Sequence, residues 1–421
     1  AHTQNGSPTA QDDRPIVPVI EGHPHVTRWL TSIHQRGPAA VVDILQEPDI
    51  NPCLLLHILV KYQATFAVTD AIVLACSAYL STATSRKGID EGQLNFSITT
   101  LCLSGCFNVT SRALLAAAPH WNRLQSLDLS CLAWAVSDEL LLQCARYCAS
   151  LQALNISGCS SLTDVAVTAI AAGSQLRSFS AAACRLLTDS ALEALSSQCT
   201  MLRIINLSHN PYLSNRGCCL LLAHCPHLSQ IVLDRCVRLT DVFLLRAAEL
   251  KELRALSVAG CPYISDAGCS ALSTGACGGM LQSLDFSYCR SLLTPSFKLP
   301  HLRHLSLAGC HSLADTAVQA VIRNCPKLTQ LNLTHNEKLG PDTTRALAKQ
   351  SMQMAALSLG LTPPSSSSSS GGGAGGGMGK VTLQGGGRWD PTPPPDLAQT
   401  PAGWYPVATG AIAPWPPGNA A

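Results

Sequence analysis

The stretch LQALNISGCSSLTD, residues 151–164, recurs along the chain and decides its fold. Two further clear copies are LRALSVAGCPYISD at 253–266 and LRHLSLAGCHSLAD at 302–315. Weaker copies fill residues 98–359, at a spacing of about 26 residues. The last two leucines of L-x-x-L-x-L are two apart, and in a β-strand such side chains point to the same side. One strand cannot bury its leucines alone, so successive copies must stack and share one core.

The second half of each copy predicts a helix. In the copy at 151, Thr163 or Asp164 can cap the helix N-terminus, and Val165, Ala166 and Ile170 follow at helical spacing. A strand and a helix repeated at this period predict an α/β fold, namely a leucine-rich repeat solenoid or horseshoe. We expect a parallel concave sheet, convex helices and an N-terminal helical cap.

Some copies depart from the pattern. The helix region of the copy at 281 is SLLTPSFKLP, which is short and interrupted by proline, so an irregular connection is expected there. Asn210 and Asn336 stand where other copies have Cys. The copy at 124 reads LDLSC where others read LSLAGC, which we interpret as the loss of one residue before Cys131.

The chain has 20 cysteines, and many recur at two repeat positions. We interpret the first series as buried free thiols, because a thiol is a small apolar filler with a weak donor. Its members are Cys106, Cys131, Cys159, Cys184, Cys236, Cys261, Cys289 and Cys310. Free thiols predict an intracellular reducing compartment, the cytoplasm. The mitochondrial matrix stays open, since a targeting peptide removed before Ala1 would be invisible.

Composition limits the function classes. The formal net charge is +2 and charged residues make up 13% of the chain, so no polybasic nucleic-acid surface is expected. No apolar run reaches the length of a membrane span. We find no catalytic motif, no metal-ligand spacing and no cofactor motif, and therefore expect a non-enzymatic protein without cofactors or metals.

Four regions are expected. Residues 1–23 form an extended N-terminal arm, residues 24–90 a helical cap or a degenerate F-box-like region, and residues 91–360 the repeat domain of about ten repeats plus a terminal partial copy. Within the second region, helices are expected at 25–35, 39–46, 52–62 and 69–82. Residues 361–421 form a Ser/Gly linker followed by a Pro/Trp-rich tail.

The stretch INPCLLLHILVKY from Ile50, followed by VTDAIVLACSAYL, resembles an F-box. The repeats themselves resemble the cysteine-containing leucine-rich repeat family, which is common in F-box proteins. That resemblance implies a Skp-type adaptor bound by Pro52, Leu54, Leu55 and Ile58. Asn51 and Cys53 depart from the F-box pattern, and its Trp is absent. A plain cap that shields the first repeat is the alternative.

Partner proteins are expected at two places. Most outward-facing strand residues are small, and the larger features of the concave face are Asp128, Ile204, Asp234, Arg235, Asp285, Tyr288 and His304. In the tail, the candidates are Trp389, Trp404, Tyr405 and Trp415. The sequence thus predicts a protein–protein interaction scaffold, a structural or assembly subunit of a larger intracellular complex. The alternative is an F-box-type substrate receptor of a cullin-type ubiquitin ligase.

Overall fold

A computed structural model describes residues 24–47, 52–61, 64–82, 99–340, 343 and 356–358. It contains one parallel sheet whose strands follow one another in sequence order. The strands are β1 Thr100–Cys102, β2 Ser126–Asp128, β3 Ala153–Asn155, β4 Ser178–Ser180, β5 Ile204–Asn206, β6 Gln230–Val232, β7 Ala255–Ser257, β8 Ser283–Asp285, β9 His304–Ser306, β10 Gln330–Asn332 and β11 Ala356–Ser358. This is the expected leucine-rich repeat arrangement.

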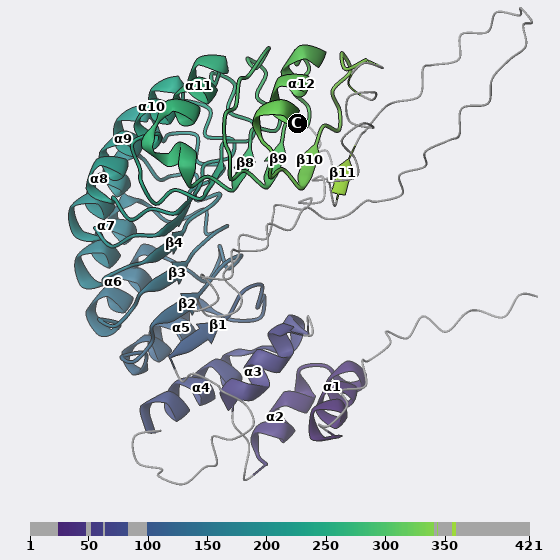
Figure 1. The fold of residues 1–421 in the computed structure, drawn as a ribbon. Helices are drawn as coiled ribbons and strands as arrows, with labels where there is room; N and C mark the ends of the chain where they lie inside the picture. Colours follow the sequence, from purple (N-terminus) through teal and green to yellow (C-terminus); the bar gives the residue numbers. More distant parts are fainter. Residues whose placement is uncertain are drawn as a thin grey trace, which may run out of the picture.

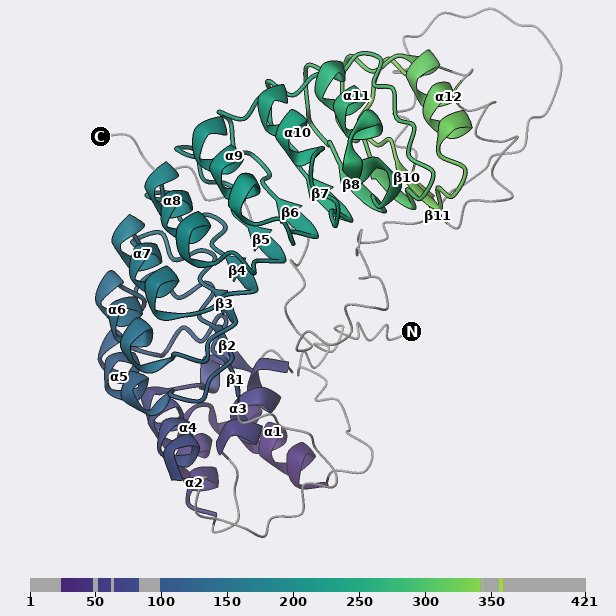
Figure 2. The same cartoon turned by 60° about the vertical axis from the view of Figure 1, so that its left-hand side comes forward.

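Helices connect most of these strands. They are α1 Pro24–Arg36, α2 Ala39–Leu45, α3 Pro52–Lys61, α4 Asp70–Thr82, α5 Ser111–Ala117, α6 Asp138–Tyr147, α7 Asp164–Gly173, α8 Asp189–Gln198, α9 Asn215–His224, α10 Asp241–Ala247, α11 Asp266–Thr274 and α12 Asp315–Asn324. Short 3₁₀ turns lie at Thr65–Ala67, Ala118–His120 and Ala276–Gly279. Figures 1 and 2 show the helices on the outer side of the arc and the strands on its inner side, which confirms the horseshoe.

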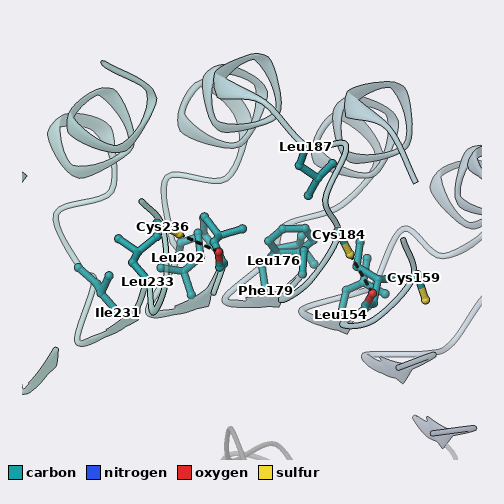
Figure 3. Packing of buried hydrophobic residues seen from close by; sticks show 14 of the residues in the cluster. Leu154, Cys159, Leu176, Phe179, Cys184, Leu187, Leu202, Ile231, Leu233 and Cys236 are labelled. Atoms are coloured by element: carbon teal, nitrogen blue, oxygen red, sulfur yellow. Dashed lines mark hydrogen bonds between the residues drawn. The ribbon is translucent and has the colours of Figure 1, made fainter. Parts of the chain in front are cut away.

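The core lies between the strands and the helices. The central residue of each strand pairs in register with that of the next, as Leu154 does with Phe179, and both are buried. Figure 3 shows how the leucines of successive repeats stack beneath the helices. Thr163 caps α7, because its side chain accepts a hydrogen bond from the backbone N of Val165. Each repeat therefore leaves its apolar side to be covered by the next.

The recurring cysteines tie the repeats together. The thiol of Cys184 donates to the carbonyl oxygen of Ile156 in the preceding repeat at 3.1 Å, and Cys236 donates to Leu207 at 3.3 Å (Figure 3). Burial raises the pKa of both thiols to about 12, so they stay protonated and can donate. The cysteines of the repeats, from Cys102 to Cys325, are free thiols, in line with the expectation.

Asn210 and Asn336 take over the same role. Nδ2 of Asn210 donates to the carbonyl of Ala181 in the preceding repeat and to that of Leu207 in its own, both at 2.9 Å. Asn336 makes the equivalent pair of bonds. The interpretation of these asparagines as substitutes for Cys is therefore confirmed.

The interpretation of Cys131 was wrong. Cys131 is exposed and has a φ of 62°, the backbone conformation that Gly158 has in the next repeat. Leu132, which is fully buried, occupies the core position of the cysteine series. The extra spacing lies after that position, because Asp138 begins α6 one residue later than the pattern of the other copies requires. The copy therefore has an insertion after the core residue and no deletion before it.

A second series of hydrogen bonds between repeats, which we call the ladder, joins the starts of the helices. The carboxylate of Asp164 accepts hydrogen bonds from the backbone N (2.8 Å) and the hydroxyl (2.6 Å) of Thr188 in the following repeat. Asp138, Asp189 and Asp241 make the same pair of bonds to the Thr or Ser of the next repeat. These bonds are charge-assisted, which makes them stronger than neutral ones.

The ladder extends into the N-terminal helices. Asp70, at the start of α4, accepts from the backbone N and the hydroxyl of Thr110, each at 2.8 Å. Thr69 also forms a parallel bridge with Asn108, and Ser77 accepts a hydrogen bond from the indole N of Trp121 at 3.1 Å. In these contacts α4 behaves as the helix of one more repeat. The four helices expected in this region are all present.

No helix connects β8 to β9, as the proline-broken sequence there predicts. The buried ring of Phe297 lies 5.7 Å from that of Phe286, centroid to centroid, and fills the core at this point. Asp266 fastens the connection, because its carboxylate accepts from the backbone N atoms of Leu293 and Thr294. The solenoid thus continues without a helix in this repeat.

Candidate partner-binding site

The concave face of the sheet is mostly a bed of small side chains. In β7, for example, Ala255 and Ser257 face this side on either side of the buried Leu256, and Ala259 follows two residues later. Such residues offer little contact area for a partner. Any strong binding must come from places where larger side chains gather.

Larger side chains gather in a hollow of about 350 Å³ over β6–β10. Asp234 and Asp285 contribute carboxylates to its lining, and serine hydroxyls from neighbouring strands lie beside them. Arg235 and Tyr288 also line it and are exposed, Tyr288 by 48%. The volume is that of a pocket for a large side chain or a short peptide segment. We call it the β6–β10 hollow.

The two carboxylates are held by their neighbours. Oδ1 of Asp234 accepts from the backbone N of Ala259 at 3.0 Å and from the hydroxyl of Ser257. Oδ1 of Asp285 accepts from the backbone N of Ser287 at 2.8 Å and from its hydroxyl at 2.5 Å. Partial burial, and next the nearby charge of Asp285, raise the pKa of Asp234 to about 6. Burial also raises the pKa of Asp285. The pair therefore favours a positively charged or hydrogen-bond-donating group.

A ledge of bulky residues borders the hollow. Arg235 and Tyr288 have φ values of 55° and 58°, at the repeat position where Gly260 and Gly309 occur in the neighbouring copies. This left-handed conformation costs a non-glycine residue about 1–2 kcal/mol. The chain thus keeps an Arg and a Tyr where glycine would be more stable. The same conformation occurs at Cys131, Ala183, His209 and His335 in other copies, so it belongs to the turn of the repeat.

Glycines make room for the ledge. A Cβ on Gly309 would lie 2.4 Å from the ring of Tyr288, so only glycine lets that ring lie across the next repeat. The ring then stacks on His335, with centroids 6.4 Å apart. In the same way, a Cβ on Gly260 would lie 2.9 Å from Cγ of Arg235. Tyr288 and Arg235 are thereby placed along the row of repeats.

His209 completes this row on the N-terminal side. It has a φ of 62° and lines the hollow together with Arg235. Burial, and then the charges of Arg235 and Arg185, lower the pKa of His209. The imidazole is therefore neutral at physiological pH, and the guanidinium of Arg235 supplies the positive charge at this end of the hollow.

The hollow brings together four of the seven residues expected on the concave face, namely Asp234, Arg235, Asp285 and Tyr288. Asp128 lies on β2 away from the hollow and is only 8% exposed. Ile204 on β5 and His304 on β9 are half-buried, and neither lines the hollow. Burial and the charge of Arg303 lower the pKa of His304.

The four residues expected to bind an adaptor lie on α3. Pro52, Leu55 and Ile58 are buried, with Leu55 fully inaccessible. The side chain of Leu54 lies outside the described residues. So do the tail candidates Trp389, Trp404, Tyr405 and Trp415, the N-terminal arm and the Ser/Gly linker.

Residues that the sequence analysis missed also line the hollow. Gln230 and Ser283 begin β6 and β8 and occupy the same outward-facing strand position as Ile204 and His304. Strand alternation could have identified them, because residues two apart share a face.

Within the described part of the chain, no helix is long and apolar enough to cross a membrane.

The Leucine Rich repeat family model matches residues 147–171, 198–221, 251–273, 298–321 and 324–348. Among solved structures, the chain is similar to the Rad7 and Elc1 complex from yeast, with 16% identity over 74% of this chain and 91% of that one and a TM-score of 0.40. It is also similar to an internalin from Listeria monocytogenes, with 18% identity over 69% of this chain and 89% of that one and a TM-score of 0.42. A third similar structure is LegL7 from Legionella pneumophila, with 15% identity over 61% of this chain and 89% of that one and a TM-score of 0.39. Likenesses this distant carry no inference about partners.

Proposed function

We propose, from the leucine-rich repeats present across residues 147–348, that this chain is a non-enzymatic scaffold that binds a partner protein at the β6–β10 hollow. Leucine-rich repeats are typically interaction domains, and stacked repeats create extended concave binding surfaces. In this proposal the chain is a structural or assembly subunit of a larger complex.

One observation carries the proposal. On a sheet face of small residues, the hollow combines Arg235 and Tyr288 with two carboxylates. Arg and Tyr are the residue types that dominate protein-interface energetics. Both stand at a turn position where glycine would be less strained, and both line the hollow.

The chemistry of the hollow suits a protruding partner side chain. Asp234 and Asp285 are close enough to raise each other's energy when both are ionised, since the charge of Asp285 raises the pKa of Asp234. A Lys or Arg from the partner would relieve this repulsion. The ring of Tyr288 lies at the rim, where it can cover the stem of such a side chain.

An F-box-type receptor is less well supported. It would need Pro52, Leu55 and Ile58 for a Skp-type adaptor, and all three are buried in the packing of the N-terminal helices. The second half of the F-box resemblance coincides with α4, which makes repeat-like contacts through Asp70. These observations support the alternative of a cap that is continuous with the solenoid.

Chemical labelling of tyrosines tests the proposal. Tyr288 and Tyr147 are exposed to similar extents, 48% and 42%, but Tyr147 lies on α6 on the convex side. A tyrosine-selective reagent should modify both in the isolated protein. In the complex purified from native cells, Tyr288 should be protected while Tyr147 still reacts. Equal labelling of Tyr288 with and without partners would refute binding at the hollow.

A further inference from the structure

A second surface follows the loops that leave the strands. The residues one and two positions after the buried Cys or Asn of each repeat are partly or fully exposed there, and several are large. We call the set Arg185, Leu186, Tyr212, Arg238, Tyr263 and Arg290 the outer loop edge. None of them lines the β6–β10 hollow. Figure 2 shows that the loops of successive repeats lie side by side between strands and helices.

Apolar side chains of this edge are open to solvent. Tyr263 is 64% exposed, and Leu186 and Tyr212 are each 49% exposed. They occupy the same position of their repeats, with Arg238 between Tyr212 and Tyr263, so the four side chains form one row. Exposed rows of large apolar side chains mark interaction sites more often than single ones do.

The edge is also held in place. Parallel bridges join Ser214 to Arg238 and Thr240 to Tyr263, so each loop is hydrogen-bonded to the next. The guanidinium carbon of Arg238 lies 5.4 Å from the ring centroid of Tyr212 in the preceding repeat. Such preorganised side chains lose little entropy when a partner binds.

The edge carries positively charged side chains. Within the described residues, Arg185, Arg238 and Arg290 form no ion pair. Asp189 and Asp241, at the helix starts, accept hydrogen bonds from Ser214 and Ser265 in the following repeat. Neither carboxylate forms an ion pair with an arginine of the edge.

We propose that the outer loop edge docks a partner protein through a segment that combines acidic with apolar side chains. The arginines supply complementary charge, and Leu186, Tyr212 and Tyr263 supply apolar contact. A nucleic acid fits less well, because three arginines set among apolar side chains do not form a polybasic surface. An aliphatic side chain such as Leu186 also has no role with phosphate. This inference goes beyond the proposed function, since it concerns different residues.

Selection from a library of random 12-residue peptides displayed on phage, with the full chain as bait, tests the inference. Enriched peptides should contain Asp or Glu together with Leu, Phe or Trp. The triple variant Arg185→Glu, Arg238→Glu and Arg290→Glu should weaken their binding at least tenfold. The matched control replaces exposed arginines on helices, with Arg112→Glu, Arg146→Glu and Arg323→Glu, and should change binding less than twofold.

Further variants separate the two surfaces and the two partner classes. Arg235→Gly with Tyr288→Gly, in the hollow, should leave binding of the selected peptides unchanged, whereas Tyr212→Ala with Tyr263→Ala should weaken it. The inference is overturned if nothing is enriched, if enriched peptides are basic or neutral, or if the control variant weakens binding equally. It is also overturned if a fluorescein-labelled 20-nucleotide single strand binds more tightly than the selected peptides.

Discussion

Replacing Arg235 by Gly should stabilise the protein, which is unusual for the loss of a large side chain. Arg235 has a φ of 55°, and relief of the left-handed conformation is worth about 1–2 kcal/mol. The greater entropy of glycine in the unfolded chain offsets about 0.5–1 kcal/mol of this gain. The Arg235 side chain is exposed, so little packing is lost. The expected net gain in the free energy of unfolding is about 0.5 kcal/mol.

Arg238→Gly is the matched control. Arg238 is also an exposed arginine of the same repeat, but it does not have a positive φ. The same substitution there brings no relief and also removes the cation–π contact with Tyr212, so it should destabilise by about 1–2 kcal/mol. Guanidinium denaturation followed by circular dichroism should therefore separate the two variants by about 1.5–2.5 kcal/mol. If Arg235→Gly destabilises as much as Arg238→Gly, then Arg235 is not strained and the argument that it is kept for binding fails.

Further predictions concern the ladders, the thiols and the carboxylates. Asp70→Ala should destabilise by about 1–3 kcal/mol and speed amide hydrogen exchange at Thr110, because two charge-assisted bonds are lost. Asp70→Asn should destabilise less, since Asn215 makes the equivalent bonds to Thr240. An Ala variant as stable as the parent would exclude α4 from the ladder. In the native protein a maleimide should modify exposed Cys131 well before buried Cys159, because burial raises the pKa of Cys159 to about 12. If mass spectrometry finds Cys159 labelled first, the assigned register is contradicted. Asp234→Asn should raise stability at pH 7.5 by about 1–2 kcal/mol. The pKa of Asp234 is raised from 3.8 to about 6. The native aspartate therefore stabilises the fold fully only below about pH 4 and loses that contribution as the pH rises through 6. If the stability advantage of the Asn variant does not shrink between pH 7 and pH 4, this reasoning is contradicted.

The repeat period was enough to predict the solenoid and its layers. Apolar residues two apart, followed by a Thr-Asp helix start, leave one way to bury the leucines, and Asn210 could be placed because it stands in register with the cysteines. Cys131 could not be placed by the same argument. A deletion before it and an insertion after it give the same letters, and only the burial of Leu132 distinguishes them.

The candidate site was predicted in part. Alternation along the strands identified Asp234 and Asp285 as facing the concave side. It could not show that Tyr288 lies across Gly309, because that depends on a positive φ and on the spacing between neighbouring repeats. The Thr69-Asp70 pair carried the signature of a repeat helix, but it was assigned to the F-box resemblance. Its role became clear only from the bonds to Thr110.

Quantitative co-purification tests the central claim most directly. The tagged parent protein and the Arg235→Gly, Tyr288→Gly variant would be purified from native cells and their partners counted by mass spectrometry. The parent should recover partner proteins at a fixed ratio, and the variant, once circular dichroism shows that it is folded, should lose them. Equal recovery by both proteins, or recovery of a Skp-type adaptor and a cullin as the main partners, would contradict a scaffold that binds through the β6–β10 hollow.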